Sequence, residues 1–295
     1  MSKGIVSSVL ASCLFAVMYG YTSLLTPLDG EEIFGWRILL TLPCLTLFML
    51  ASKDWKLVGG LLARVRQTPM LVFGMLGTSW LMGLQLWLFL WAPLHGRSLE
   101  VSMGYFLLPL AMVMTGRLVY GERLSRLQTV AVCCAALGVG HELYQHGSFA
   151  WETLLVMTGY PIYFVLRRRC RTDHLGGLWC DMCLLLPWAL YFVIQGPLGS
   201  ADLAAHPGLY GLIPLLGAIS ALALIAYVLA SRQLPFGLFG LLSYVEPVLL
   251  VGVSLLLGAT IGPDQWLTYL PIWAAVLVLV LEGIKHLLRQ RRRSV

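Results

Sequence analysis

The sequence predicts an all-α integral membrane protein with ten transmembrane helices, arranged as two inverted five-helix repeats. Three observations predict this fold: an apolar composition, ten apolar runs separated by short polar breaks, and a proline-centred pattern that occurs once in each half. The 295 residues are 59% hydrophobic and 12% charged, whereas a soluble domain has about 25% charged residues. This composition excludes a soluble enzyme, a disordered protein and a fibrous protein.

The length suits one polytopic membrane domain, because ten helices of about 20 residues use roughly 200 residues and leave about 95 for ends and loops. The first apolar run follows Lys3 and resembles a signal peptide, but it exceeds the roughly 7–15 residues of a typical apolar signal region, so we expect it to be retained. The expected helices lie near residues 4–25, 32–51, 69–92, 98–116, 124–143, 150–166, 174–194, 207–230, 236–258 and 265–288.

Basic residues predict the orientation of these helices. Of the 20 Lys and Arg residues, all except Arg37 and Arg97 fall in one set of alternate connecting segments or at the two ends. The positive-inside rule then places both termini in the cytoplasm and requires an even number of helices. We interpret the basic tail Arg289–Arg293 as a topology anchor that contacts anionic lipid rather than nucleic acid.

The two halves share a pattern around a mid-helix proline. Tyr105 precedes Pro109 in the first half, and Tyr244 precedes Pro247 in the second. Because each half would contain five helices, an odd number, the second repeat would be upside down relative to the first. This is the plan of secondary transporters, whose substrate site lies near the membrane midplane. We therefore divide the chain into repeats at 1–144 and 145–295.

Few features of the sequence suggest catalysis or a cofactor. Cys180 and Cys183 form a C-x-x-C pair, but a structural zinc site needs four ligands and no second pair lies nearby. No phosphate-binding loop, nucleophile elbow or zinc-protease motif occurs. We therefore expect no cofactor, no metal and no enzymatic activity, and an active transporter of this kind would use an ion gradient, with protons the first choice.

Several motifs resemble those of one transporter family. They are Trp36-Arg37, the segment Leu99–Pro109, Gly121-Glu122-Arg123, Tyr163 before Arg167-Arg168, and Asp181 before Pro187. Together they resemble the RarD branch of the EamA transporters, within the drug/metabolite transporter superfamily. The resemblance implies a ten-helix permease of the bacterial inner membrane that exports amino acids, metabolites or drugs, and RarD proteins carry a label of chloramphenicol sensitivity.

The sequence departs from this branch at four positions. Trp36 stands where the branch has His, Leu108 and Gln85 where it has Asn, and Glu246 where it usually has Gly. We therefore expect a substrate preference that differs from that of other RarD proteins. The label of chloramphenicol sensitivity is then a poor guide to the substrate of this chain.

Three charged residues within predicted helices are candidates for the transport pathway, because a charge in the bilayer is costly. Glu246 lies ten residues into its predicted helix, about 15 Å deep, beside the helix-kinking Pro247. Arg37 lies about 9 Å below the outer boundary, where it could clamp a carboxylate or reach the interface instead. Asp181 lies about 10 Å from the cytoplasmic side, so a polar partner or cavity is expected.

Further pathway candidates are polar or helix-bending residues at membrane depth. Glu100 is shallower, and an ion pair with Arg97 explains it equally well. A tryptophan stripe in the third helix is more typical of lipid or helix packing, which leaves Gln85 on another face as the better cavity residue. The remaining candidates are Tyr105, Pro109, Tyr163 and Tyr244.

The leading hypothesis is an inner-membrane secondary transporter that exports small organic metabolites or drugs, such as amino-acid-like or chloramphenicol-like compounds. Its expected partners are a small-molecule substrate and the lipid bilayer, with no nucleic acid, and no sequence feature supports a homodimer. Two alternatives stay open. A membrane-embedded enzyme acting on lipid would need catalytic residues clustered near one leaflet, and a channel would not need the inverted repeat.

Overall fold

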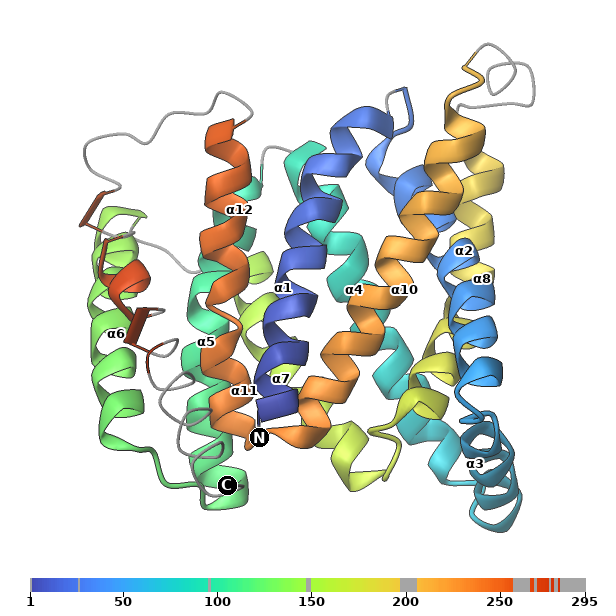
Figure 1. Cartoon of the computed structure of the whole chain (residues 1–295), viewed down its shortest axis with the longest axis horizontal. Helices are drawn as coiled ribbons and strands as arrows, with labels where there is room; N and C mark the ends of the chain where they lie inside the picture. Colours follow the sequence, from blue (N-terminus) through green and yellow to red (C-terminus); the bar gives the residue numbers. More distant parts are fainter. Residues whose placement is uncertain are drawn as a thin grey trace, which may run out of the picture. The chain divides into compact units, whose positions relative to one another are not determined.

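The computed structural model describes residues 2–25, 27–94, 97–146, 150–196 and 206–256, together with 266–267, 270–275, 277–278 and 281. All regular elements in these ranges are helical (Figure 1). They are α1 (Ser2–Thr22), the 3₁₀ helix η1 (Ser23–Leu25), α2 (Gly30–Ala51), α3 (Lys56–Gln67), α4 (Leu71–Leu94), α5 (Ser98–Tyr120), α6 (Arg126–His146), α7 (Trp151–Arg169), α8 (Leu175–Gln195), α10 (Leu209–Gln233), α11 (Phe236–Leu242) and α12 (Val245–Leu256).

Five of the described helices are long and apolar enough to cross a membrane, namely α1, α2, α4, α8 and α10. This confirms an all-helical, multi-pass membrane architecture. The predicted helix 265–288 and the basic tail lie largely outside the described residues, so the number ten stays a prediction.

The chain divides into two compact units, each built from segments that are distant in the sequence. Unit 1 consists of Met1–Ala16, Leu99–Pro161 and Leu229–Val295, and unit 2 consists of Val17–Ser98 and Ile162–Val228. Unit 2 holds α2, α3, α4 and α8 with parts of α1, α7 and α10, whereas unit 1 holds α6, α11, α12 and nearly all of α5.

In unit 2, helix α2 packs closely against α8 and α4. A capping box at Asp29 begins α2, since its side chain accepts the Glu32 N–H at 2.8 Å and the Glu32 carboxylate accepts the Asp29 N–H. Gly35 brings the backbones together, because a Cβ there would lie 2.7 Å from the carbonyl oxygen of Ala189. The buried Phe34 fills the same contact with its ring against those of Trp188 and Phe192 in α8.

Unit 1 has its own apolar core between α5, α6 and the segment containing α11. Gly240 permits close packing, because a Cβ at this position would overlap the Cβ of Met112 in α5. The buried cluster comprises Phe106, Val113, Ala131, Ala135, Val139, Leu241, Tyr244, Ile272 and Ala275.

The structure corrects the prediction of one continuous helix over 236–258. Helix α11 ends at Leu242, a turn occupies Ser243 and Tyr244, and α12 starts at Val245. Pro247 has no N–H to donate to the Ser243 carbonyl and is well tolerated in the first turn of α12, which favours a break before it, although α5 continues through Pro109. The regular helix from which the depth of Glu246 was calculated is therefore interrupted by a turn at Ser243 and Tyr244.

A second correction concerns the segment between the second and third predicted helices, where the apolar pattern predicts a loop. Residues 56–67 form the amphipathic helix α3, whose Val58 and Leu61 are buried, and Leu61 packs against Met75 of α4 and Cys180 of α8. Three basic side chains keep this helix too polar to span a bilayer, and Arg64 donates to the carbonyls of Cys170 and Arg171 at 2.9 and 3.0 Å.

Candidate functional site

A buried arginine lies within the membrane-length helix α2 of unit 2. The side chain of Arg37 in α2 is only 3% exposed, and its Nε donates to Ser220 Oγ in α10 at 3.0 Å. Burying a guanidinium costs free energy unless polar groups replace its water. Ser220 provides one such group from a different helix.

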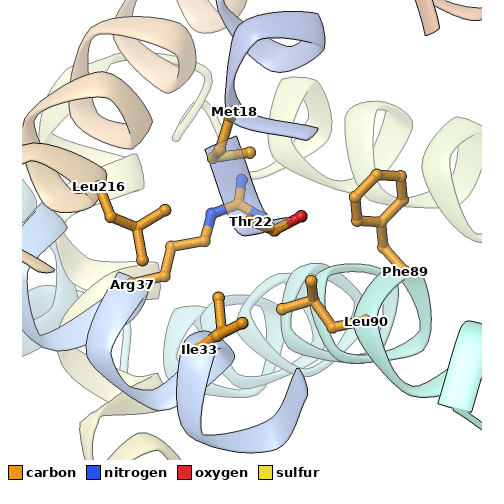
Figure 2. A pocket seen from close by; sticks show the side chains of 7 residues that line it. All are labelled: Met18, Thr22, Ile33, Arg37, Phe89, Leu90 and Leu216. Carbon is orange, nitrogen blue, oxygen red and sulfur yellow. The ribbon is translucent and has the colours of Figure 1, made fainter. Parts of the chain in front are cut away.

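Arg37 lines a small cavity formed by α1, α2, α4 and α10 of unit 2. Figure 2 shows the guanidinium extending from α2 toward Met18 and Thr22 of α1. The cavity volume is about 10 Å³, close to the minimum that holds one water molecule. A solute would therefore need these helices to separate. The other lining residues are Ile33, Phe89, Leu90 and Leu216.

Two further polar side chains lie on the helix faces next to this cavity. Gln85 is 1% exposed and stands one turn before Phe89 in α4. Thr41 is fully buried one turn after Arg37, and its hydroxyl has no hydrogen-bond partner in the described part of the chain. Residues four apart in a helix share a face, so Arg37 and Thr41 form a polar strip in an otherwise apolar helix.

A second polar centre joins α7, α8 and their connection. Arg167 is 1% exposed, and its guanidinium has five N–H groups. Nε donates to the Thr172 carbonyl at 3.1 Å, and Nη2 donates to the carbonyls of Thr172 and His174 at 2.6 and 2.8 Å. Nη1 donates to Tyr163 Oη at 2.5 Å and to Asp181 Oδ2 at 3.3 Å. These five contacts match its full donor capacity.

Asp181 is the acceptor at the centre of this network, which confirms the expectation of a polar partner. Its Oδ1 accepts from Thr78 Oγ1 at 2.7 Å, and Oδ2 accepts from Arg167 and, at 3.4 Å, from Tyr163 Oη. Ser79 donates to the Asp181 backbone carbonyl at 3.0 Å. The carboxylate thus ties α8 to both α4 and α7, an arrangement that favours holding helices together over binding a solute.

The other six sequence candidates belong to unit 1. Tyr244 is fully buried and donates to the Phe106 carbonyl at 3.0 Å, which links the α11–α12 turn to α5. Tyr105 is half-buried, with its ring 6.2 Å from that of Tyr160. Glu100 is half-buried in the first turn of α5, where its backbone carbonyl accepts from Thr153 at 2.6 Å.

Both repeat prolines are buried, and Glu246 is half-buried in the first turn of α12. Glu246 lies beside the break between α11 and α12. Its carboxylate is therefore at the start of a helix, whereas a continuous helix would place it in the helix interior. Pro109 lies inside the continuous helix α5, whereas Pro247 lies in the first turn of α12.

Glu122, from the Gly-Glu-Arg motif, has a structural role. Its carboxylate accepts the backbone N–H groups of Phe236 and Gly237 at 2.5 and 2.7 Å, where α11 begins. A carboxylate is favourable there because the first N–H groups of a helix have no partner within it. The preceding Gly121 has φ of +64°, a conformation that glycine adopts easily.

The cysteines form no redox or metal centre in the described residues. All seven are free, and no group of three metal-binding side chains occurs there. Burial raises the pKa of the Cys170 thiol, an effect that the nearby Arg64 partly opposes. This thiol between α7 and α8 is therefore held in its protonated, less reactive form.

Comparisons with known proteins identify the family. No family model matches the chain. The "Chloramphenicol-sensitive protein RarD" of Pseudomonas aeruginosa is 44% identical over 294 residues, which cover 99% of this chain and 98% of the relative. The chain belongs to the RarD family. The resemblance drawn from the motifs is thereby confirmed, and this RarD-family chain is a multi-pass membrane protein of a transporter family.

Other relatives support the same family assignment. The "Uncharacterized transporter PM1281" of Pasteurella multocida is 41% identical over 98% of this chain and 99% of its own length. The "Protein RarD" of Streptomyces exfoliatus is 28% identical over 92% of this chain and 85% of its own length. A solved crystal structure with 18% identity gives a TM-score of 0.65 over 97% of this chain and 99% of that one, which supports the fold alone.

Proposed function

We propose that this RarD-family protein is a secondary transporter of the bacterial inner membrane that exports small organic solutes, with Arg37 binding the anionic group of the solute. The observation that carries the proposal is the guanidinium of Arg37, which is 3% exposed in a membrane-length helix and lines a cavity between four helices. Such a charge within the membrane marks a substrate or ion pathway in many transporters.

The chemistry of the cavity favours a carboxylate-bearing solute with an apolar part. A guanidinium can bind a carboxylate through two parallel hydrogen bonds. The hydroxyls of Ser220 and Thr41 are additional polar groups at or near the cavity, and the other walls are mainly apolar. Amino-acid-like metabolites have this combination, so they are the solute class that we propose.

A growth screen tests the function directly. Cells that overexpress the protein should tolerate higher concentrations of the exported solute when amino acids, their analogues and antibiotics are screened. Cells with the Arg37→Ala variant at equal membrane abundance should lose that tolerance. Unchanged tolerance across all compounds in the wild-type strain would argue against export.

The proposed architecture consists of two inverted repeats, 1–144 and 145–295, with both termini in the cytoplasm. The charge asymmetry between alternate segments supports this orientation. A reporter fused after Gly199, which lies outside the described residues, should therefore be exposed to the periplasm. Alkaline phosphatase activity at this fusion is the expected result, and fluorescence of a cytoplasmic reporter there would overturn the topology.

Glu246 is our candidate for proton coupling, because it is a half-buried carboxylate at the break between α11 and α12. Glu246→Gln retains the size of the side chain but cannot release a proton. We expect counterflow exchange to survive in this variant, whereas uphill export driven by a pH gradient should fail. Uphill export at the wild-type rate would exclude Glu246 as the coupling residue, and loss of both activities in a folded protein would make it a substrate ligand or a gate.

A further inference from the structure

A groove on the outer surface of unit 2 lies between α4 and α8 and is separate from the Arg37 cavity. Its volume is about 340 Å³, within the range of about 300–1,000 Å³ that is usual for small-molecule sites. Four of its residues are well exposed: Trp80 by 59%, Leu76 by 46% and Leu184 by 41%, together with Pro187. The remaining lining residues are Ser79, Leu185 and Trp188.

Two tryptophans form an aromatic wall in this groove. The rings of Trp80 and Trp188 are stacked, with centroids 5.6 Å apart and an interplanar angle of 20°. From the start of each helix, at 1.5 Å per residue, they lie roughly 14 and 20 Å along the axis, near the middle of a hydrocarbon layer of about 30 Å. Tryptophans normally concentrate at the membrane interfaces instead.

The indole N–H groups of these two residues are available for a ligand. In the described part of the chain, neither Trp80 nor Trp188 has a hydrogen-bond acceptor for its Nε1. Other tryptophans of unit 2 have one, since Trp87 donates to Glu31 at 3.3 Å and Trp179 donates to Thr46 at 2.9 Å. Lipid chains carry no acceptor at this depth, so hydrocarbon alone leaves both donors unsatisfied.

We propose that this groove binds planar, uncharged aromatic compounds that carry a hydrogen-bond acceptor and reach the protein from the bilayer. The compound would lie against the stacked indoles, which favour offset ring contacts. Its acceptor would receive a hydrogen bond from the indole N–H of Trp80, the more exposed of the two tryptophans, and the leucines and Pro187 would cover its apolar edge. This site differs from the proposed Arg37 site in both charge and access.

The test uses 7-methoxycoumarin, a planar neutral carbonyl compound, and naphthalene, which has similar rings but no acceptor. Both are titrated against full-length protein in phosphatidylcholine nanodiscs, with empty nanodiscs as the partition blank. We expect saturable coumarin binding and naphthalene binding about threefold to tenfold weaker, the range of one neutral hydrogen bond. Equal binding of the two probes, or no saturable coumarin binding, would overturn the proposal.

Variants separate the ring from its N–H. Trp80→Phe keeps an aromatic ring and should weaken coumarin binding severalfold without changing naphthalene binding, whereas Trp80→Leu should weaken both. The matched control is Trp55→Phe, because Trp55 is also exposed and paired with an indole, that of Trp179, but lies outside the groove. This control should bind like the wild type, and equal coumarin binding by Trp80→Phe and wild type would contradict the site.

Other possible occupants of the groove would give different experimental results. In one test, a phospholipid with a brominated chain is added as a quencher of tryptophan fluorescence. Quenching that coumarin does not reverse would assign the groove to an acyl chain. A change from dimer to monomer in Trp80→Leu would assign it to a second copy of the chain. Because binding is measured without transport, saturable binding in a protein with no exchange activity would sustain this site and overturn the transport function.

Discussion

Arg167→Met should lower the stability of the protein severely. The change removes all five donated hydrogen bonds of a guanidinium that is 1% exposed, and it leaves the carboxylate of Asp181 buried without its cation. Breaking a buried ion pair in this way costs about 3–5 kcal/mol. Thermal unfolding in detergent, followed by scattering and tryptophan fluorescence, should show a large fall in Tm and low membrane abundance.

The neighbouring Arg169→Met is the matched control, because Arg169 is exposed and its replacement removes the same charge from the same helix end. This variant should unfold near the wild-type temperature. The double variant Arg167→Met with Asp181→Leu should recover part of the lost stability, since no buried charge is then left alone. Strictly additive effects of the two single changes would show that the pair is not coupled.

Arg37→Ala should abolish exchange of a carboxylate-bearing solute while the protein stays folded. Hydrogen bonds to a charged group contribute about 1.5–3 kcal/mol, so losing the clamp should weaken solute binding by tenfold or more. Arg37→Lys keeps the charge but not the planar, two-pronged geometry, so its activity should be only partly restored. The measurement is counterflow of a labelled amino acid in proteoliposomes, at matched protein content.

Arg117→Ala is the control for Arg37, because it removes an exposed arginine from the last turn of α5. This variant should exchange at the wild-type rate. Unlabelled amino acids should compete with the labelled solute, whereas their methyl esters should compete poorly because they lack the carboxylate. Normal exchange by well-folded Arg37→Ala, or equal competition by acid and ester, would return Arg37 to a purely structural role.

The all-helical membrane class and most helix positions can be predicted because apolar runs of membrane length are a direct consequence of bilayer thickness. The same reasoning singles out Arg37 and Asp181, since a charge in such a run requires a partner or a cavity. It does not find the partner of Asp181. Arg167 reads as one more basic residue of a cytoplasmic segment, and its burial depends on the tight α7–α8 connection, a tertiary feature.

A weak signal for Arg167 is present in the sequence, because Tyr163 stands four residues before it on the same helix face. Two local features also escape prediction. Helix α3 is too short and too basic to be predicted as a transmembrane helix, although its apolar residues have helical spacing. The break at Ser243 and Tyr244 is hard to predict because two signals conflict. The apolar run favours one continuous helix, whereas Pro247 favours an interruption.

Counterflow by the wild-type protein tests the central claim most directly. Proteoliposomes are loaded with an excess of the unlabelled solute found in the growth screen and diluted into a trace of the labelled solute. Our account predicts transient accumulation of chemically unchanged label that depends on the internal solute, because alternating access exchanges one bound solute for another. Simple equilibration without accumulation, as in a channel, or a chemically altered label, as from an enzyme, would contradict it.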